Sequence, residues 1–124
     1  MSQLFRVDID KINRTINNFK RSKILVICDL MLDSYIRGKV NRISPEAPVP
    51  IVLVEKESFM PGGAFNVAMN IAGLKGHCWV TGLIGRDAMG QQLKQVSMHQ
   101  RIHRQGILTD ENYTTIVKSR IIAN

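Results

Sequence analysis

The sequence contains few of the residues that several common functions require. Only two of its 124 residues are cysteines, Cys28 and Cys78, and they lack the CxxC spacing of zinc and redox motifs. Both lie in apolar segments, so we expect free, buried thiols in a reducing compartment rather than a disulfide. Aromatic residues make up 6% of the chain, too few for the stacking surface of a single-strand nucleic-acid binder. We therefore expect no metal site and no nucleic-acid partner.

Long apolar runs are also missing. No segment is long enough to cross a membrane, and the first ten residues, MSQLFRVDID, contain acids where a secretory signal needs an apolar stretch. These features predict a cytoplasmic protein without a membrane partner. A hydrophobic fraction of 44% with four prolines is typical of a globular chain of one domain or part of one. The formal charge of +7 favours anionic ligands but does not identify them.

The order of apolar patterns predicts an α/β fold. Apolar residues at helical spacing over 1–22 predict an amphipathic N-terminal helix, which we interpret as packed on the domain, with a membrane-surface helix as the alternative. The next segment, KILVICD, is continuously apolar, as in a strand buried in a parallel sheet. Helical and strand patterns then alternate, and Asp87 is placed to cap a helix. We assign residues 23–124 to one α/β unit.

Two stretches predict a smaller, separate sheet. Residues 35–55 contain strand-like sequences separated by Pro45, Pro48 and Pro50, which exclude a regular central strand. Residues 113–123 alternate between polar and apolar side chains, with Lys118 and Arg120 on one face. We predict that these strands form an accessory sheet beside the main one.

Gly62 and Gly63 precede a predicted helix in the stretch MPGGAFNVAMN. Glycine adopts backbone angles closed to other residues and lets a ligand approach the peptide closely. The free N–H groups of the following helix would point at such a ligand, and Asn66 offers both donors and an acceptor to a polyol hydroxyl. The alternative is a tight turn that only starts a helix.

Two carboxylates follow the first predicted strand in the segment DLMLD. Ligands of open α/β sheets bind beyond the carboxyl ends of strands, and the carboxylates of Asp29 and Asp33 could accept hydrogen bonds from sugar hydroxyls there. The alternative role is capping of a helix or turn. His77, His99 and His103 show no ligand-like spacing and are interpreted as surface or structurally satisfied residues.

Five segments in this order resemble the ribokinase-like (PfkB) carbohydrate kinases: KILVICDLMLD, NRISPEAPVPIV, PGGAFNVAMNIAGL, GLIGRDAMG and TTIVKSRIIAN. The resemblance covers about residues 23–124, and RISPEAPVP is most similar to the heptose 7-phosphate kinase branch. It implies the amino-terminal part of a ribokinase-like fold, a Rossmann-like sheet with a small accessory β lid. The lid strands would be those at about 35–55 and 113–123.

The resemblance also implies roles for individual residues. Asp33 would bind sugar hydroxyls, Gly62 and Gly63 would form the turn on the sugar side, and Asn66 would hydrogen-bond the substrate. The further substrate-binding candidates are Asp29, Arg42, Lys118 and Arg120, the basic ones because the expected substrate carries a phosphate. Phe65 replaces a small residue of the family, so it either crowds the substrate pocket or faces the core.

The implied reaction is ATP-dependent phosphorylation of D-glycero-β-D-manno-heptose 7-phosphate at the anomeric hydroxyl, with Mg²⁺, in ADP-heptose synthesis for lipopolysaccharide. The sequence lacks the family's late GAGD-type motif, so we assign no catalytic, metal or ATP-binding residue and expect no turnover by this chain alone. Expected partners are the phosphorylated sugar and either a second copy, paired through the lid strands, or a missing C-terminal part. The alternative function is a non-catalytic sugar-phosphate-binding or dimerisation module.

Overall fold

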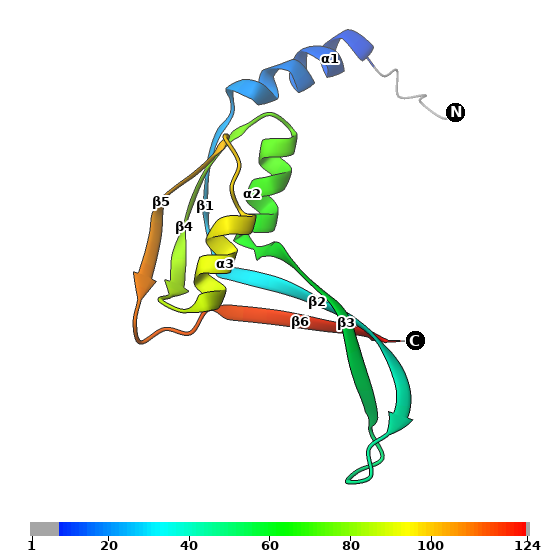
Figure 1. The fold of residues 1–124 in the computed structure, drawn as a ribbon. Coiled ribbons are helices and arrows are strands. Elements are labelled where there is room, and N and C mark those ends of the chain that lie inside the picture. The colour runs from blue at the N-terminus through cyan, green and yellow to red at the C-terminus, as the bar shows by residue number, and fades with distance from the viewer. Residues whose placement is uncertain (1–7, 124) are drawn as a thin grey trace, which may run out of the picture.

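The computed structural model describes residues 8–123, which form two three-stranded sheets (Figure 1). The first sheet is parallel and has the order β1–β4–β5, from β1 (Lys23–Ile27), β4 (His77–Gly85) and β5 (Ile102–Asp110). The second has the order β3–β2–β6, from β2 (Leu30–Ile43), β3 (Pro50–Gly63) and β6 (Ile116–Ala123). Strand β2 pairs antiparallel with β3 and parallel with β6. The predicted α/β class is confirmed.

The core lies between the parallel sheet and two helices, α2 (Ala64–Gly73) and α3 (Ala88–Val96). Helix α2 turns three alanines and Phe65 inward, and the small alanine side chains let the helix approach the sheet closely. Phe65 is fully buried, so it faces the core and does not crowd a pocket. The other large, fully buried apolar side chains are Leu30, Leu32, Cys78, Val80, Ile84 and Leu93.

Helix α1 (Ile9–Asn18) precedes the first strand and is followed by the 3₁₀ turn η1 (Phe19–Arg21). Asp8 caps α1, because its carboxylate accepts a hydrogen bond from the Lys11 N–H at 2.9 Å. Our expectation that this helix packs on the domain is wrong for 9–18: no residue of α1 is buried, and its isoleucines stay exposed. Residues 1–7 of the predicted helix, including Phe5, lie outside the described part of the chain.

The accessory sheet is longer than the sequence predicts. Strands β2 and β3 form a ribbon that extends away from the body of the molecule, while β6 lies along β2 (Figure 1). Strand β2 begins at Leu30 and β3 continues to Gly63, so Asp33 and both glycines lie within strands. Pro61 lies in β3, the edge strand of this sheet among the described strands, which is where a sheet tolerates proline.

The two cysteines are free, as expected, but only one is buried. Burial raises the pKa of the Cys78 thiol, which lies in the core. Cys28 is exposed, and the prediction of a buried thiol is wrong there because β1 ends at Ile27 and the chain turns toward β2. Among the described residues, no helix has both the length and the apolar character needed to span a membrane.

Asp87 links the two sheets. Its Oδ1 accepts a hydrogen bond from the Gly90 N–H at 2.7 Å and so caps α3, as the sequence predicts. Its Oδ2 accepts another from the Thr115 N–H at 2.8 Å, just before β6. The Thr115 hydroxyl accepts a third from the Gly85 N–H at 2.9 Å, at the end of β4. The backbone N–H groups of Thr115 and then Gly90 hold the pKa of Asp87 below its ordinary value.

We expect Asp87→Ala to lower the free energy of unfolding by about 2 kcal/mol, because it removes a helix cap and a bond between the sheets. Since folding lowers the pKa of Asp87, this stabilisation is complete above the pKa of the unfolded chain and is lost as pH falls through the folded pKa. Urea unfolding at pH 7 and at stepwise lower pH measures both effects. If the difference in the free energy of unfolding between wild type and Asp87→Ala stayed constant on acidification, the ionised Asp87 carboxylate would not be the source of the stabilisation.

Candidate functional site

Asp33 lies on β2 at the base of the accessory sheet, opposite Lys118 of β6. Its Oδ1 is 3.3 Å from the Lys118 Nζ and 3.4 Å from an Arg120 guanidinium nitrogen, and its side chain is only 15% exposed. The two cations more than offset the single charge of the carboxylate, yet neither is aligned to form a hydrogen bond, and Oδ1 is buried without a hydrogen-bond partner. A buried acceptor of this kind is an attractive partner for a ligand hydroxyl.

Arg120 is held in place by a residue that the sequence analysis did not identify, Tyr35. The guanidinium of Arg120 donates a hydrogen bond to the Tyr35 hydroxyl at 3.0 Å and lies 5.0 Å from the centre of its ring. Tyr35 occurs two residues after Asp33 on the same strand, so its side chain points to the same face. The period-2 pattern of the strand is the signal that could have identified it.

Both glycines pack against the residues of the site. A β-carbon at Gly62 would lie 3.1 Å from the Asp33 carboxyl carbon. Gly63 has a φ of +55°, and a β-carbon there would lie 2.5 Å from the Asp29 carbonyl oxygen. That oxygen accepts a hydrogen bond from the Ala64 N–H at 3.1 Å. The strand β3 therefore passes directly into α2, because glycine allows both the turn and the close contact.

Asn66 lies in the first turn of α2 and is exposed. No side chain caps this end of the helix. The Ala64 N–H is bonded to the Asp29 carbonyl, which leaves the next N–H groups of the first turn and the positive end of the dipole for a ligand. Asn66, Asp33 and the glycine pair thus occur on elements that meet where β3 ends. A ligand with several hydroxyls and a negative charge would complement this set.

The structure separates some predicted residues from this group. Asp29 takes part through its backbone carbonyl, which accepts the Ala64 N–H. Arg42 pairs with Ile51 near the far end of the β2–β3 ribbon. It is nine residues from Asp33 along β2 (42 − 33), and at about 3.3 Å per residue the two are roughly 30 Å apart. Arg42 therefore does not belong to the same site.

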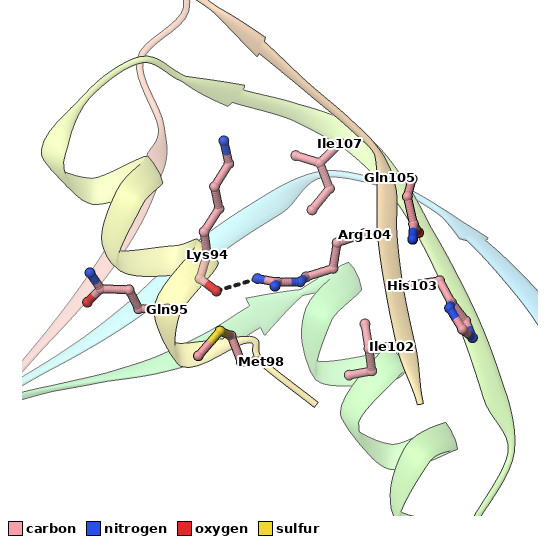
Figure 2. A pocket seen from close by; sticks show the side chains of 8 residues that line it. All are labelled: Lys94, Gln95, Met98, Ile102, His103, Arg104, Gln105 and Ile107. Atoms are coloured by element: carbon pink, nitrogen blue, oxygen red, sulfur yellow. Dashed lines mark hydrogen bonds between the residues drawn. The ribbon is translucent and has the colours of Figure 1, made fainter. Parts of the chain in front are cut away.

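A groove of about 580 Å³ lies elsewhere, between α3 and β5. Figure 2 shows its lining, in which an Arg104 guanidinium nitrogen donates a hydrogen bond to the Lys94 carbonyl oxygen at 2.6 Å. Met98 and Ile107 contribute apolar surface to it. It contains none of the predicted substrate-binding residues, so it is not part of the site around Asp33.

Three proteins named bifunctional protein HldE are similar to this chain in sequence. The one from Gluconobacter oxydans is 44% identical over 109 residues, the one from Magnetococcus marinus 46% over 104, and the one from Helicobacter pylori 48% over 101. The alignments cover 87%, 84% and 82% of this chain. The chain spans only 23%, 21% and 22% of the length of these relatives. No protein-family model matches the sequence.

Solved structures share the fold. A carbohydrate kinase from Agrobacterium tumefaciens superposes with a TM-score of 0.66 at 19% identity, over 82% of this chain and 32% of that one. The chain has the ribokinase-like fold of these solved structures. An aminoimidazole riboside kinase from Salmonella enterica, complexed with its riboside and an ATP analogue, superposes with a TM-score of 0.57 at 24% identity, over 79% and 28%. The predicted ribokinase-like fold is confirmed.

Proposed function

We propose that this chain is the sugar-binding part of a kinase that phosphorylates D-glycero-β-D-manno-heptose 7-phosphate at its anomeric hydroxyl, using ATP, in ADP-heptose synthesis. The observation that carries the proposal is the buried Asp33 oxygen, which has no hydrogen-bond partner and lies beside two cations. The identity to HldE proteins supports the heptose branch of the ribokinase-like family. The cytoplasm is the proposed location, because the reaction consumes ATP.

Each residue of the site has a distinct role in this proposal. Asp33 accepts a hydrogen bond from a sugar hydroxyl, and Gly62 and Gly63 let the end of β3 pack closely against Asp33 and Asp29, which positions the Asp33 carboxylate. Asn66 and the open end of α2 bind further oxygens. Lys118 and Arg120 attract the phosphate that the substrate already carries. These contacts would fix the orientation of the sugar before phosphoryl transfer.

ATP and Mg²⁺ would supply the phosphoryl group and neutralise its charge. Within 8–123, no three His, Cys, Asp or Glu side chains are grouped as metal ligands. These residues therefore do not fit a metal site, and we assign no step to the metal or to ATP. The proposed partners are the sugar phosphate and either a second copy, paired through the lid strands, or the remaining part of the kinase.

We expect Asp33→Asn and Asn66→Ala each to weaken binding of D-glycero-β-D-manno-heptose 7-phosphate by about 10- to 100-fold. Asp33→Asn replaces a charged acceptor with a weaker neutral one, and Asn66→Ala removes a hydrogen-bonding side chain. Isothermal titration calorimetry with the 124-residue chain measures this effect. The matched control is Asn70→Ala, which removes the same side chain from an exposed position on the same helix. Equal affinity of the Asn66 and Asn70 variants, or no binding by the wild type, would refute the proposed site.

A further inference from the structure

The accessory sheet carries most of its positive charge on one face. Side chains alternate between the two faces of a strand, and directly paired residues of neighbouring strands share a face. The face of Leu32 and Val117 packs toward the core. The opposite face has four cations and one carboxylate where the register of 31–37 is regular, a net charge of +3 (4 − 1). We call it the basic face; its charged side chains are Asp33, Arg37, Lys56, Lys118 and Arg120.

Two cations of the basic face lie directly opposite each other. Arg37 of β2 pairs with Lys56 of β3 in the antiparallel ladder, and both residues are exposed. Like charges opposite each other destabilise a strand pair, and within residues 8–123 neither side chain forms an ion pair. Two residues further along β2, in contrast, the Lys39 Nζ lies 2.5 Å from a Glu55 carboxylate oxygen. An external anion at Arg37 and Lys56 would remove a repulsion that the chain itself leaves uncompensated.

Tyr35 connects this pair of cations to the site around Asp33. It lies midway between Asp33 and Arg37 on the same face of β2, and its direct partner on β6 is Arg120. The Arg120 guanidinium is held between the Asp33 carboxylate at 3.4 Å and the Tyr35 hydroxyl at 3.0 Å. Because this hydroxyl accepts a hydrogen bond from Arg120, its own proton is free to bind a further acceptor. At about 3.3 Å per residue, Tyr35 lies ~6.6 Å beyond Asp33 along the strand and Arg37 ~13 Å beyond it.

We propose that Arg37, Lys56 and Arg120, together with the Tyr35 hydroxyl, form a phosphate-binding subsite that makes the sugar site selective for phosphorylated sugars. This inference rests on the proposed function and deepens it, because it names further residues that contact the substrate and gives the substrate a direction. The ring hydroxyls bind at Asp33, and the phosphate lies outward along the β2–β3 ribbon (Figure 1). A phosphate offers several acceptor oxygens, which suit the forked donors of arginine and the long, flexible stem of lysine.

Titration of inorganic phosphate into the 124-residue chain tests the subsite without a sugar. Backbone amide NMR spectra are compared with a chloride titration at the same ionic strength. We expect phosphate alone to shift the amides of Tyr35, Arg37, Lys56 and Arg120. The double variant Arg37→Gln/Lys56→Gln should bind phosphate about tenfold more weakly, because each exposed charge contributes roughly threefold. Equal shifts with chloride, or equal phosphate affinity of wild type and double variant, would overturn the subsite.

The matched control is Lys39→Gln, which makes the same chemical change on the same strand, at a lysine that Glu55 already pairs. Its effect on phosphate affinity should stay below about twofold. A decrease for Lys39→Gln as large as that for Arg37→Gln would mean that phosphate responds only to the overall charge of the chain, and would overturn a specific subsite.

The selectivity itself is measured with two sugars by isothermal titration calorimetry. The quantity is the Kd for D-glycero-D-manno-heptose divided by the Kd for its 7-phosphate. Arg37→Gln and Lys56→Gln should each lower this ratio by about threefold, and Tyr35→Phe should lower it although it removes no charge, because Arg120 loses the hydroxyl that holds it. A ratio that these variants leave unchanged would overturn the proposal. Phosphate binding at these residues without binding of either heptose would preserve the subsite and count against the proposed function.

Discussion

Phe65→Ala is expected to lower the free energy of unfolding by about 3–5 kcal/mol, the cost typical of removing a buried aromatic ring from a core. Phe65 is fully buried on the first turn of α2 and packs within the core between that helix and the parallel sheet. Alanine would leave a cavity that the sheet and helix cannot easily close. Since small domains are stable by only about 5–15 kcal/mol, a large fraction of the variant should be unfolded well below the midpoint of the wild type.

Val67→Ala is the matched control for this prediction, because it shortens another apolar side chain on the same helix at a position that is 48% exposed. We expect a change within about 0.5 kcal/mol for this variant. Urea unfolding followed by circular dichroism at low temperature compares the two. Similar midpoints for the variants would mean that Phe65 does not lie in the core, and the alternative of a side chain that crowds the sugar pocket would return.

Local sequence patterns predicted those elements in which the spacing of apolar side chains follows the burial of the element. The apolar segment KILVICD contains β1, and the alternating segment YTTIVKSRIIAN contains β6. Asp87 was identified as a helix cap from its position alone, because a capping side chain needs only the N–H groups of the next turn. In each of these cases the stabilising contacts are either local or follow from a simple period.

Strand β5 was not predicted, and its sequence explains why. The segment IHRQGILTD contains a glycine and several polar residues that have low strand propensity. Its conformation depends on pairing with β4, about 25 residues earlier, and on Ile102 and Ile107 packing toward the helices. Its other face carries Leu108 and is bare, so the apolar periodicity of a fully buried strand is missing.

The composition of the candidate site was only partly predictable. The glycine pair and Asp33 follow from motif and position, but the contacts of Asp33 with Lys118 and Arg120 depend on the register between β2 and β6, which are distant in sequence. Arg42 was included because it is basic, and sequence alone could not show that a long ribbon carries it away from the site. The pairing register of strands that are distant in sequence, rather than local propensity, decides which charged side chains come into contact.

Gly63→Ala is expected to lower the free energy of unfolding by about 3 kcal/mol, because two costs of roughly 1–3 kcal/mol each add. The φ of +55° is strained for any residue with a β-carbon. The new methyl group would lie 2.5 Å from the Asp29 carbonyl oxygen, which is backbone and already accepts the Ala64 N–H. To relieve the clash, the end of β3 must move away from the Asp29 backbone, and α2 moves with it.

Gly73→Ala makes the same chemical change at the other end of α2, where a β-carbon would meet no atom within 4 Å. Alanine is preferred over glycine in a helix, so this variant should be more stable than wild type by about 0.5–1 kcal/mol. Urea unfolding should therefore give shifts of opposite sign for the two variants. Binding of heptose 7-phosphate should fall only for Gly63→Ala, because that variant alone displaces the open end of α2 from Asp33. Unchanged stability and binding in Gly63→Ala would mean that the backbone there can relax without cost, and that close packing of Gly63 against Asp29 does not position the site.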